Sequence, residues 1–365
     1  MSRPLEVALV GYGYAGRVFH APLVAHTPGL RLRAVVSRDA ARVQADFPQA
    51  EVLTDPAQAF AMPGIDLVVI AAPNAVHGPL AIAALRAGRH VLVDKPFATT
   101  LDEARQVAAA ADAAGRIASV FQNRRWDADF LALRELVQSG VLGEVAELHS
   151  HFDRFRPQVP DRWRERPGAG AGLWFDLGPH LVDQVLQLFG LPLSVQADIG
   201  AQRDGALVDD FFHVVLRYRR LRAVLHAGAL VPAGSLRFAV HGTRGSFIKH
   251  GLDPQEAALR AGIAPGGADW GRDPRPGTVA RIDADGHVDE RVFPGPSGDY
   301  RACYAAMREA ILGHGAPPVG LGEALEVMQV LEAGRESAAS GCAVALRPDP
   351  PDPLSAPPAP AGGPG

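Results

Sequence analysis

The stretch Leu5 Glu6 Val7 Ala8 Leu9 Val10 Gly11 Tyr12 Gly13 Tyr14 Ala15 Gly16 decides the fold of this chain. Its first six residues form an apolar run typical of a buried strand, and the glycines that follow have the spacing G-x-G-x-x-G. In a strand–turn–helix unit, the first glycine permits the tight turn. The second lets the backbone approach a pyrophosphate, and the third lets the helix pack closely on the strand. The alternative is an ordinary glycine-rich turn.

Strand and helix patterns alternate downstream of this turn. Apolar runs predict strands over 30–36, 66–72, 90–93 and 117–121, and helical spacing predicts helices over 78–87 and 101–114. Such alternation is typical of an α/β protein with a doubly wound parallel sheet. We therefore expect a dinucleotide-binding Rossmann domain over residues 1–122.

Length and charge narrow the remaining choices. A chain of 365 residues with 47% hydrophobic content exceeds the size at which single cores usually divide, so we expect two domains. The formal charge of −4 gives no field that would favour nucleic acid or an anionic membrane. Two cysteines cannot form a disulfide framework, and no apolar run reaches ~18 residues. We expect a cytoplasmic enzyme with a small-molecule partner and no metal site.

The end of the second strand bears on cofactor choice. Sites that prefer NAD usually place an Asp or Glu there, whereas this chain has Ser37 and Arg38 followed by Asp39. Ser37 can donate to a 2′-phosphate, and Arg38 can pair with it. We therefore expect NADP, with NAD possible. In the alternative, Arg38 is a solvated loop residue and Asp39 caps the next helix.

Polar residues follow two further strands at the edge where a nucleotide would lie. Pro73 stops the strand 66–72, and Asn74 and His77 follow it. Taken alone, Asn74 is equally typical of a turn and His77 of a helix start. The strand 90–93 is followed by Asp94 Lys95 Pro96, which would place an ammonium group in the crevice.

The second half of the chain supplies a partner for Lys95. We expect a helix that begins near Asp176 and runs to Phe189, since Pro179 is tolerated only in a first turn. Asp176 and His180 would then be i,i+4 neighbours, and Asp183 would lie three residues beyond His180. A carboxylate beside an imidazole orients it and stabilises its protonated form, as general-base catalysis requires. The alternative is a capping Asp and a core His.

These residues together resemble the glucose–fructose oxidoreductase, inositol dehydrogenase and MocA family. Its marks are an N-terminal G-x-G-x-x-G, a Glu-Lys-Pro motif after the fifth strand, and an Asp shortly before a helical His. Here they correspond to Gly11 to Gly16, to Asp94 Lys95 Pro96, and to Asp176 with His180. Asp94 departs from the usual Glu and is one methylene shorter, so its hydrogen bond to the cofactor or to Lys95 would need a backbone shift or a water molecule.

Within the family, the branch of NADP-dependent scyllo-inositol dehydrogenases is the most similar. The likeness rests on four segments: Val18 Phe19 His20, residues 123–130, Arg154 Phe155 Arg156 Pro157, and Arg162 Trp163 Arg164 Glu165. The resemblance implies a C-terminal α/β domain with a large, mostly antiparallel sheet. It also implies that the open face of this sheet joins subunits into a homodimer or homotetramer.

The C-terminal half supports this picture on its own evidence. Strand patterns occur over 144–155, 195–203, 211–218, 223–230 and 236–242, several of them joined by short turns, which favours antiparallel pairing. Helical spacing follows over 300–312 and 322–339. We expect a substrate-binding and oligomerisation domain over 123–347 and a disordered Pro/Ala/Gly tail over 348–365.

An arginine-rich loop, with Arg154, Arg156, Arg162, Arg164 and Arg166, precedes the Asp176 helix. It contains Trp163, and it is either a solvated surface segment or a polar lid that donates to substrate hydroxyls and excludes water. We predict that the substrate is bound by Lys95, Asn123, Arg125, Arg154, Trp163, Asp176 and His180. We predict that the cofactor is bound by Gly11, Tyr12, Gly13, Tyr14, Ala15, Gly16, Ser37, Arg38, Pro73, Asn74, His77, Asp94, Lys95, Pro96 and Asn123.

The expected reaction is reversible hydride transfer between a secondary alcohol of a polyol, cyclitol or sugar and the nicotinamide. His180 would take the hydroxyl proton, Lys95 would stabilise charge on the same oxygen, and Asp176 would orient His180. Two rivals remain. One is a catalytically silent regulator that binds the nucleotide, and the other is a nicotinamide-dependent glycoside hydrolase.

Overall fold

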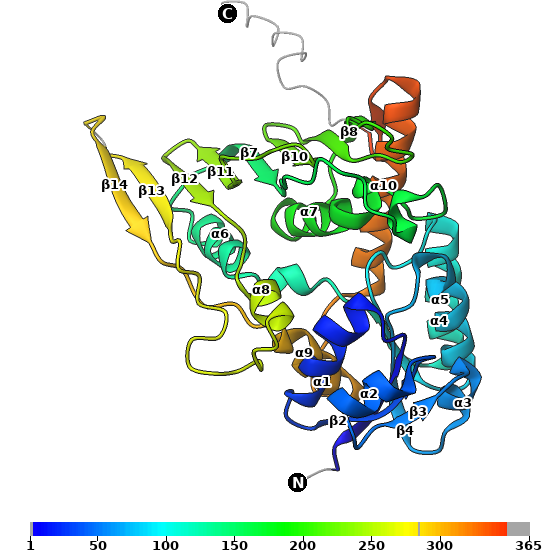
Figure 1. The fold of residues 1–365 in the computed structure, drawn as a ribbon. Coiled ribbons are helices and arrows are strands. Elements are labelled where there is room, and N and C mark those ends of the chain that lie inside the picture. Colours follow the sequence, from blue (N-terminus) through cyan, green and yellow to red (C-terminus); the bar gives the residue numbers. More distant parts are fainter. Residues whose placement is uncertain (1–2, 284, 349–365) are drawn as a thin grey trace, which may run out of the picture.

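A computed structural model describes residues 3–283 and 285–348 of the chain, and the tail expected over 348–365 lies outside it from residue 349 on. The described chain builds two sheets with their covering helices (Figure 1). The six-stranded sheet holds the N-terminal part, and a nine-stranded sheet holds most of the rest. This arrangement confirms the predicted fold class.

The first sheet is parallel throughout, in the order β3-β2-β1-β4-β5-β6. Its strands are β1 Leu5–Val10, β2 Leu30–Val36, β3 Glu51–Leu53, β4 Ile65–Ile70, β5 His90–Val93 and β6 Ala118–Val120. The sequence-based prediction missed β3, because three residues are too few to show a period. The order reverses between β1 and β4, and in open α/β sheets ligands bind beyond the carboxyl ends of the strands at that point.

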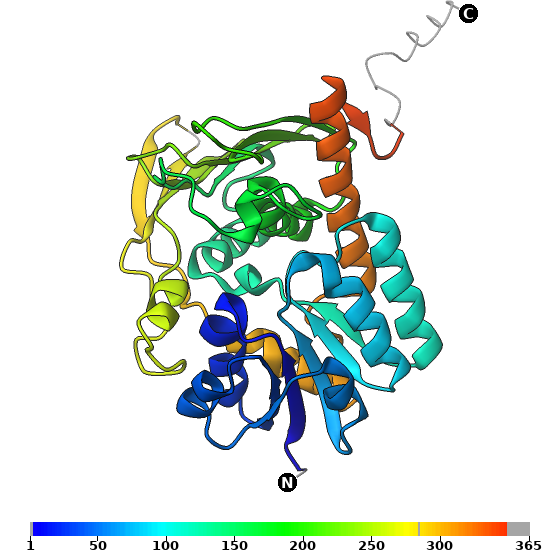
Figure 2. The same cartoon turned by 45° about the vertical axis from the view of Figure 1, so that its right-hand side comes forward.

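Helices cover both faces of this sheet. One face packs on α3 Pro56–Ala61, α4 His77–Arg86 and α5 Leu101–Ala114. The other face packs on α1 Ala21–Ala25 and on α9 Arg301–Ile311, which returns from the far end of the chain. Figure 2 shows α9, in orange, lying against the blue N-terminal segments. The remaining helix of this half, α2 Ala40–Asp46, follows β2.

The glycine turn after β1 is sterically enforced at two of its three glycines. Gly11 has a φ of +101°, and a Cβ there would lie 2.5 Å from the carbonyl oxygen of Ala71. A Cβ on Gly16 would lie 2.1 Å from the carbonyl oxygen of Gly11. A Cβ on Gly13 would meet no atom within 4 Å. The first and third glycines therefore serve the packing of strand and helix, whereas Gly13 faces open space.

The second sheet has the order β14-β13-β12-β11-β7-β10-β9-β8-β15. All neighbouring pairs are antiparallel except β7 with β10. Its strands are β7 Val145–His151, β8 Ser194–Gly200, β9 Phe211–Arg217, β10 Arg222–Gly228, β11 Leu236–Gly242, β12 Gly245–His250, β13 Gly277–Ile282, β14 Val288–Phe293 and β15 Val344–Ala345. The strand predicted over 144–155 ends at His151.

Helices lie on the side of this sheet that faces the first sheet (Figure 1). They include α6 Ala128–Gln138, α7 Leu173–Phe189 and α10 Leu321–Ser340, and the short α8 Gln255–Arg260 lies near the first domain. None of the described helices is long and apolar enough to cross a membrane. The opposite face of the sheet is open, as the sequence led us to expect.

Helix α7 begins earlier than predicted. It starts at Leu173 rather than near Asp176, and Pro179 therefore lies inside the helix and not in its first turn. The start is fixed from a distant segment, since a carboxylate oxygen of Asp209 accepts from the Trp174 amide at 2.6 Å. Pro179 has no N–H for the Phe175 carbonyl, a local cost that the buried surroundings of α7 offset.

Helices α7 and α10 are held together by Trp174. Its ring is buried, and its indole N–H donates to the Leu331 carbonyl at 3.0 Å. A Cβ on Gly334 would lie 2.8 Å from this ring, whereas a Cβ on Gly322 of the same helix would meet no atom within 4 Å. Gly334 therefore permits the close approach of the two helices.

We predict that Gly334→Ala lowers the free energy of unfolding by about 1–3 kcal/mol, because an extra methyl overpacks the contact with Trp174. The matched variant Gly322→Ala should be neutral or stabilising by up to ~1 kcal/mol. Urea denaturation of both variants checks this, and an unchanged midpoint for Gly334→Ala would show that the two helices can separate at no cost.

Candidate active site

A cleft of about 1640 Å³, open to solvent, lies between the two sheets. The first domain lines it with the glycine turn and with the segments that follow β4, β5 and β6, and the second domain lines it with α7, α8 and the arginine-rich loop. Of the predicted site residues, the cleft brings together Gly13, Tyr14, Ala15, Pro73, Asp94, Lys95, Asn123, Arg154, Trp163, Asp176 and His180.

Lys95 follows β5 and crosses from the first domain to the second. Its ammonium donates to a carboxylate oxygen of Asp176 at 2.9 Å and also to the Asp176 backbone carbonyl. Burial lowers the pKa of Lys95, and the Asp176 charge only partly offsets this effect. Lys95 is one of two lysines in a chain with 36 Lys and Arg residues; the other, Lys249, is buried in an ion pair with Asp273. The chain therefore places in this cleft a cation that shifts its pKa more readily than an arginine does when it is buried.

Asp176 is the carboxylate on which the positive side chains of the cleft converge. Burial alone would raise the pKa of this carboxyl, but Lys95 and Arg164 lower it far below its usual range. Arg164 lies 3.7 Å from the same carboxylate oxygen that Lys95 contacts. Asp176 is consequently ionised at any ordinary pH and fixes the position of the ammonium.

His180 lies one helical turn after Asp176 and is 5% exposed. Burial and the charges of Lys95 and Arg124 lower its pKa well below the usual value. Its Nδ1 is buried and has no hydrogen-bond partner among the described residues. The imidazole is therefore neutral near pH 7 and has the lone pair that a proton acceptor needs.

Two contacts differ from the sequence-based expectation. No hydrogen bond joins Asp176 to His180 in the described structure; the carboxylate contacts Lys95 and Arg164 instead, and the imidazole is not held protonated. Arg125 does not line the cleft, because its guanidinium binds both oxygens of Asp183 at 2.7 and 2.9 Å. This pair joins the segment after β6 to α7, so Asp183 has a positioning role in the fold.

The aromatic residues of the glycine turn differ in their surroundings. The Tyr12 hydroxyl donates to Asp46 at 2.9 Å on the side away from the cleft. Tyr14 lines the cleft, is half exposed, and donates to Glu256 at 3.2 Å. Gly13 and Ala15 lie beside it along the cleft wall, so a ligand seated there meets backbone rather than bulky side chains.

The residues after β2 lie at the surface. The Ser37 hydroxyl accepts from the Asp39 amide at 3.1 Å, and Asp39 caps α2 by accepting from the Arg42 amide. The capping role considered for Asp39 is therefore confirmed. Arg38 is exposed, and no carboxylate in the described part of the chain pairs with it.

The residues after β4 are engaged in structural hydrogen bonds. The side-chain amide of Asn74 donates to the Gly170 carbonyl at 2.8 Å, which ties this turn to the arginine-rich loop. The ring nitrogens of His77 contact the carbonyls of Pro96 and Ala72 at 2.8 and 2.9 Å. Pro73 lines the cleft, whereas Asn74, His77 and Pro96 do not.

The Asp94 carboxylate contacts the backbone of Lys95 and the ring of His20, and not the Lys95 ammonium. Its carboxylate accepts from the backbone amide of Lys95 at 2.9 Å and lies 3.7 Å from His20 Nε2. Burial would raise its pKa, but the His20 contact and the Lys95 charge lower it to about 2. The shorter side chain thus reaches the backbone of Lys95 directly.

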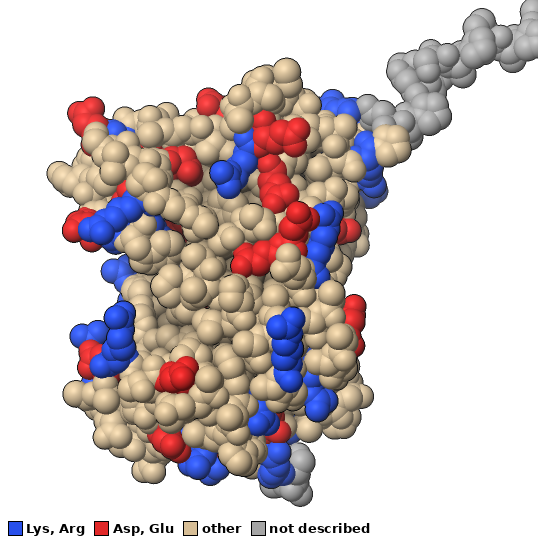
Figure 3. Space-filling model, turned by 90° about the vertical axis from the view of Figure 1, so that its right-hand side faces the viewer, with Lys and Arg blue, Asp and Glu red and all other residues tan. Residues whose placement is uncertain are grey.

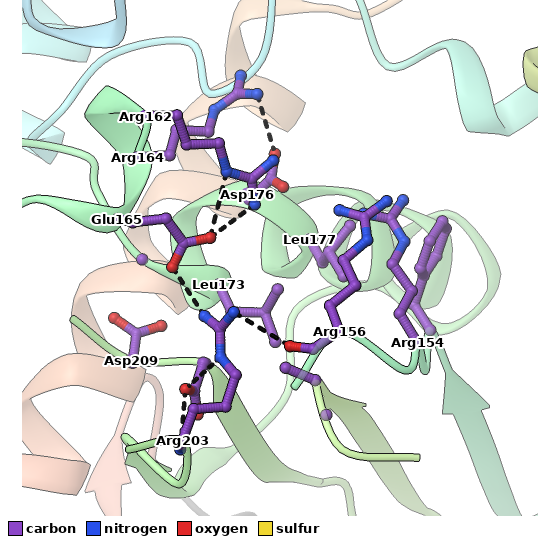
Figure 4. Close-up of a pocket in the computed structure, with 15 residues that line it drawn as sticks. Arg154, Arg156, Arg162, Arg164, Glu165, Leu173, Asp176, Leu177, Arg203 and Asp209 are labelled. Carbon is purple, nitrogen blue, oxygen red and sulfur yellow. Dashed lines mark hydrogen bonds and ion pairs between the residues drawn. The ribbon is translucent and has the colours of Figure 1, made fainter. Parts of the chain in front are cut away.

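On the side of the second domain, the cleft continues into a smaller pocket among arginines (Figure 4). Glu165 accepts from Arg162 and from Arg203, which fastens the loop to the second domain. Arg154 and Arg156 lie side by side near Leu177 and point away from this cluster. Arg154 stacks over the Phe152 ring at 4.8 Å, and no carboxylate in the described chain lies within ion-pair distance of it.

Sequence reasoning missed several residues of the cleft. Arg124 donates to Glu256 at 2.7 Å and also pairs with Asp127, so it joins α8 to the segment after β6. Arg124 could have been predicted, since it follows the predicted site residue Asn123 in the sequence. Glu256 had no motif to mark it, because the loop that brings it to Tyr14 has no recognisable spacing. The other missed residues are Phe19, Phe121, Leu177 and Arg260.

Comparisons with known proteins agree with this architecture. Residues 5–122 match the model described as the oxidoreductase family with an NAD-binding Rossmann fold, and residues 134–346 match the model for its C-terminal alpha/beta domain. The uncharacterized oxidoreductase YdgJ of Escherichia coli K12 is 51% identical over 93% of this chain and 97% of its own length. The NADP(+) scyllo-inositol 2-dehydrogenase IolW of Bacillus subtilis is 38% identical over 91% and 93%.

Solved structures give the same result. A putative oxidoreductase from Klebsiella pneumoniae is 48% identical, with a TM-score of 0.88 over 95% of this chain and 96% of its own. The two family models cover most of the chain, and the cleft between the matched domains has the predicted lysine, aspartate and histidine. The chain belongs to the Gfo/Idh/MocA family of oxidoreductases.

Proposed function

We propose that the protein transfers hydride reversibly between the secondary alcohol of an inositol-like cyclitol, polyol or sugar and NADP. The observation that carries this proposal is the Lys95–Asp176 pair, buried in a cleft directly beyond the glycine turn, with His180 one helical turn away. Names of relatives support the substrate class, since one is a scyllo-inositol 2-dehydrogenase and a more distant one is a 1,5-anhydro-D-fructose reductase.

The cleft has room for a nicotinamide nucleotide at the glycine turn. Gly13 faces open space, so the backbone there is free to meet a pyrophosphate, and Tyr14, Ala15 and Pro73 would lie along it. When bound, the nicotinamide supplies the acceptor or donor of hydride. Asn123 and Asp94, also in the lining, would flank the ring end.

Lys95 and His180 act on the substrate oxygen. The neutral imidazole of His180 accepts the hydroxyl proton during oxidation, and the Lys95 ammonium donates a hydrogen bond to the same oxygen and stabilises its negative charge. In reduction the proton returns to that oxygen. Asp176 fixes the ammonium, and Arg154 and Trp163 offer a donor and an apolar face to the rest of the substrate.

The choice of NADP rests on the end of β2. Arg38 is exposed without a carboxylate partner, and Ser37 stands beside it, so both are free to meet a 2′-phosphate. Asp39 occupies the helix cap and does not replace the acidic residue of NAD-preferring sites. We also propose that the open face of the second sheet joins subunits into a dimer or tetramer.

We predict that Lys95→Met lowers kcat by roughly 100-fold or more, because the variant loses the donor to the reacting oxygen. Binding of NADPH, measured by fluorescence titration, should change little. Lys95→Arg keeps the charge, but its larger planar guanidinium cannot place a donor where the compact ammonium does, so its kcat should also fall. Wild-type turnover in Lys95→Met, with inositol isomers and aldoses as substrates, would refute the assignment.

Measuring NADPH formation from inositol isomers and aldoses also distinguishes the dehydrogenase from the two other candidate functions, a silent regulator and a glycoside hydrolase. Stoichiometric NADPH from an unsubstituted polyol supports the dehydrogenase. A silent regulator would form none, and a glycoside hydrolase would need a glycosidic bond and would return the hydride to the substrate.

We predict that Gly13→Ala weakens nucleotide binding by roughly tenfold or more while leaving Tm unchanged, because its methyl group would enter ligand space and touch no protein atom. Gly16→Ala is the comparison, since its Cβ would clash with Gly11 and should lower Tm. Calorimetric titration with NADPH and thermal melts measure both. Unaltered affinity in Gly13→Ala would place the nucleotide elsewhere.

We predict that Arg38→Ala raises the Kd for NADPH by roughly 10- to 100-fold and leaves the Kd for NADH unchanged, since one charge-assisted contact to the 2′-phosphate is lost. Arg33→Ala is a matched control, because Arg33 is exposed on β2, the strand that Arg38 follows, and lies near Glu51. An equal change for both nucleotides in Arg38→Ala would contradict the NADP preference.

A further inference from the structure

The open face of the second sheet carries a row of imidazoles at its centre. His226 of β10 lies opposite His151 of β7 on one side and opposite His213 of β9 on the other. The next residue toward the strand start, Leu225, is fully buried and faces the helices. Side chains alternate along a strand, so the three histidines share the outer face.

Asp153 adds a carboxylate to two of these rings. One of its oxygens lies 3.3 Å from His151 Nδ1, and the other lies 3.3 Å from His226 Nε2. The two rings have their centroids 4.9 Å apart. One ligand-type atom from each of these three residues lies within 4.8 Å of the other two. The three side chains thus converge on one point.

The contact between His151 Nδ1 and Asp153 is a long hydrogen bond, and its length is also compatible with two ligands of one metal ion. Bonds from a charged donor or acceptor are usually about 2.7–2.9 Å long. Two ligand atoms in a tetrahedral site with metal bonds near 2.0–2.1 Å are separated by roughly 3.3–3.4 Å. The other ring nitrogens, His151 Nε2 and His226 Nδ1, have no hydrogen-bond partner among the described residues. Asp153 is thus the one described group that contacts the facing nitrogens of the two rings.

The carboxylate is held in place from behind. The backbone amide of Gly228 donates to an Asp153 oxygen at 3.0 Å, which orients the group as outer-sphere bonds orient metal ligands. In the single chain the side chains of His151 and His226 are 19% and 18% exposed, so an ion can reach them from solvent before this face meets another subunit. The cluster is preformed and open.

We propose that His151, Asp153 and His226 bind a divalent transition-metal ion of the zinc class. Two imidazoles and one carboxylate are a typical zinc ligand set, with the fourth position left to water or to His213. None of the three ligands lines the catalytic cleft. The proposal departs from the expectation, drawn from the cysteines, that the chain has no metal site.

The position of the site points to a structural role. Asp153 immediately precedes Arg154, whose backbone amide donates to the Gly228 carbonyl at 3.0 Å. An ion bound here would clamp the segment after β7 to the end of β10. It would thereby fix the base from which Arg154 reaches the cleft.

The test is a calorimetric titration of the full-length, tag-free protein with ZnCl₂. We expect about one Zn²⁺ per chain and a rise in Tm with zinc, since an ion that binds only the folded state stabilises it. His151→Gln, Asp153→Asn and His226→Gln should each weaken binding by roughly tenfold or more, because even outer-sphere changes cost 10–100-fold. Titration with CoCl₂ should give the visible absorption of a tetrahedral site in the wild type alone.

Two other variants serve as controls. His250→Gln removes an exposed histidine of the same sheet, and His287→Gln removes one from the exposed group Asp283, Asp285 and His287. Both should bind zinc as the wild type does. Wild-type zinc binding in His151→Gln and His226→Gln, loss only in His287→Gln, or no saturable binding by the wild type would overturn the proposal.

Discussion

The ion pair between Lys95 and Asp176 is the interaction on which the site depends. It joins the end of β5 in the first domain to α7 in the second, so it fixes where the two domains meet. Both groups are buried, and a buried pair costs desolvation that only good geometry repays. Here Lys95 also donates to the Asp176 backbone carbonyl. The pair therefore holds the Lys95 ammonium in one buried position in the cleft, whereas an unpaired lysine would be solvated and mobile.

The same charges set the state of the neighbouring imidazole. His180 is buried close to Lys95 and Arg124, and their field disfavours a third cation. A neutral histidine beside a fixed ammonium is an asymmetric pair, because one group accepts a proton and the other donates. The different protonation states of Lys95 and His180 follow from burial and from the neighbouring charges. The same causes operate in other sites where one titratable group acts as an acid and another as a base.

Much of this arrangement could be predicted from local pattern. The glycine turn, the parallel strands and the residues after β5 follow from apolar runs and from motif spacing, which depend on neighbours in sequence. The contacts between side chains could not be predicted in this way, because they join residues that are far apart in the sequence. The start of α7 was misplaced because its cap is Asp209, 35 residues from Trp174. Arg125 was predicted to bind the substrate because the sequence near it does not indicate that Asp183, 58 residues away, is its partner.

The return of α9 to the first domain makes the two halves interdependent. Cys303, Tyr304 and Met307 complete the apolar layer under β1 and β4, and the Tyr304 hydroxyl contacts His20 at 2.6 Å. A growing polypeptide on the ribosome cannot finish its N-terminal half until more than 300 residues have been made. A gene fragment that stops after β6 would lack α9 and would expose the part of the sheet that α9 covers, so simple truncation would not give a complete Rossmann unit. The backbone also crosses between the halves three times, so any opening of the cleft must bend three connections together.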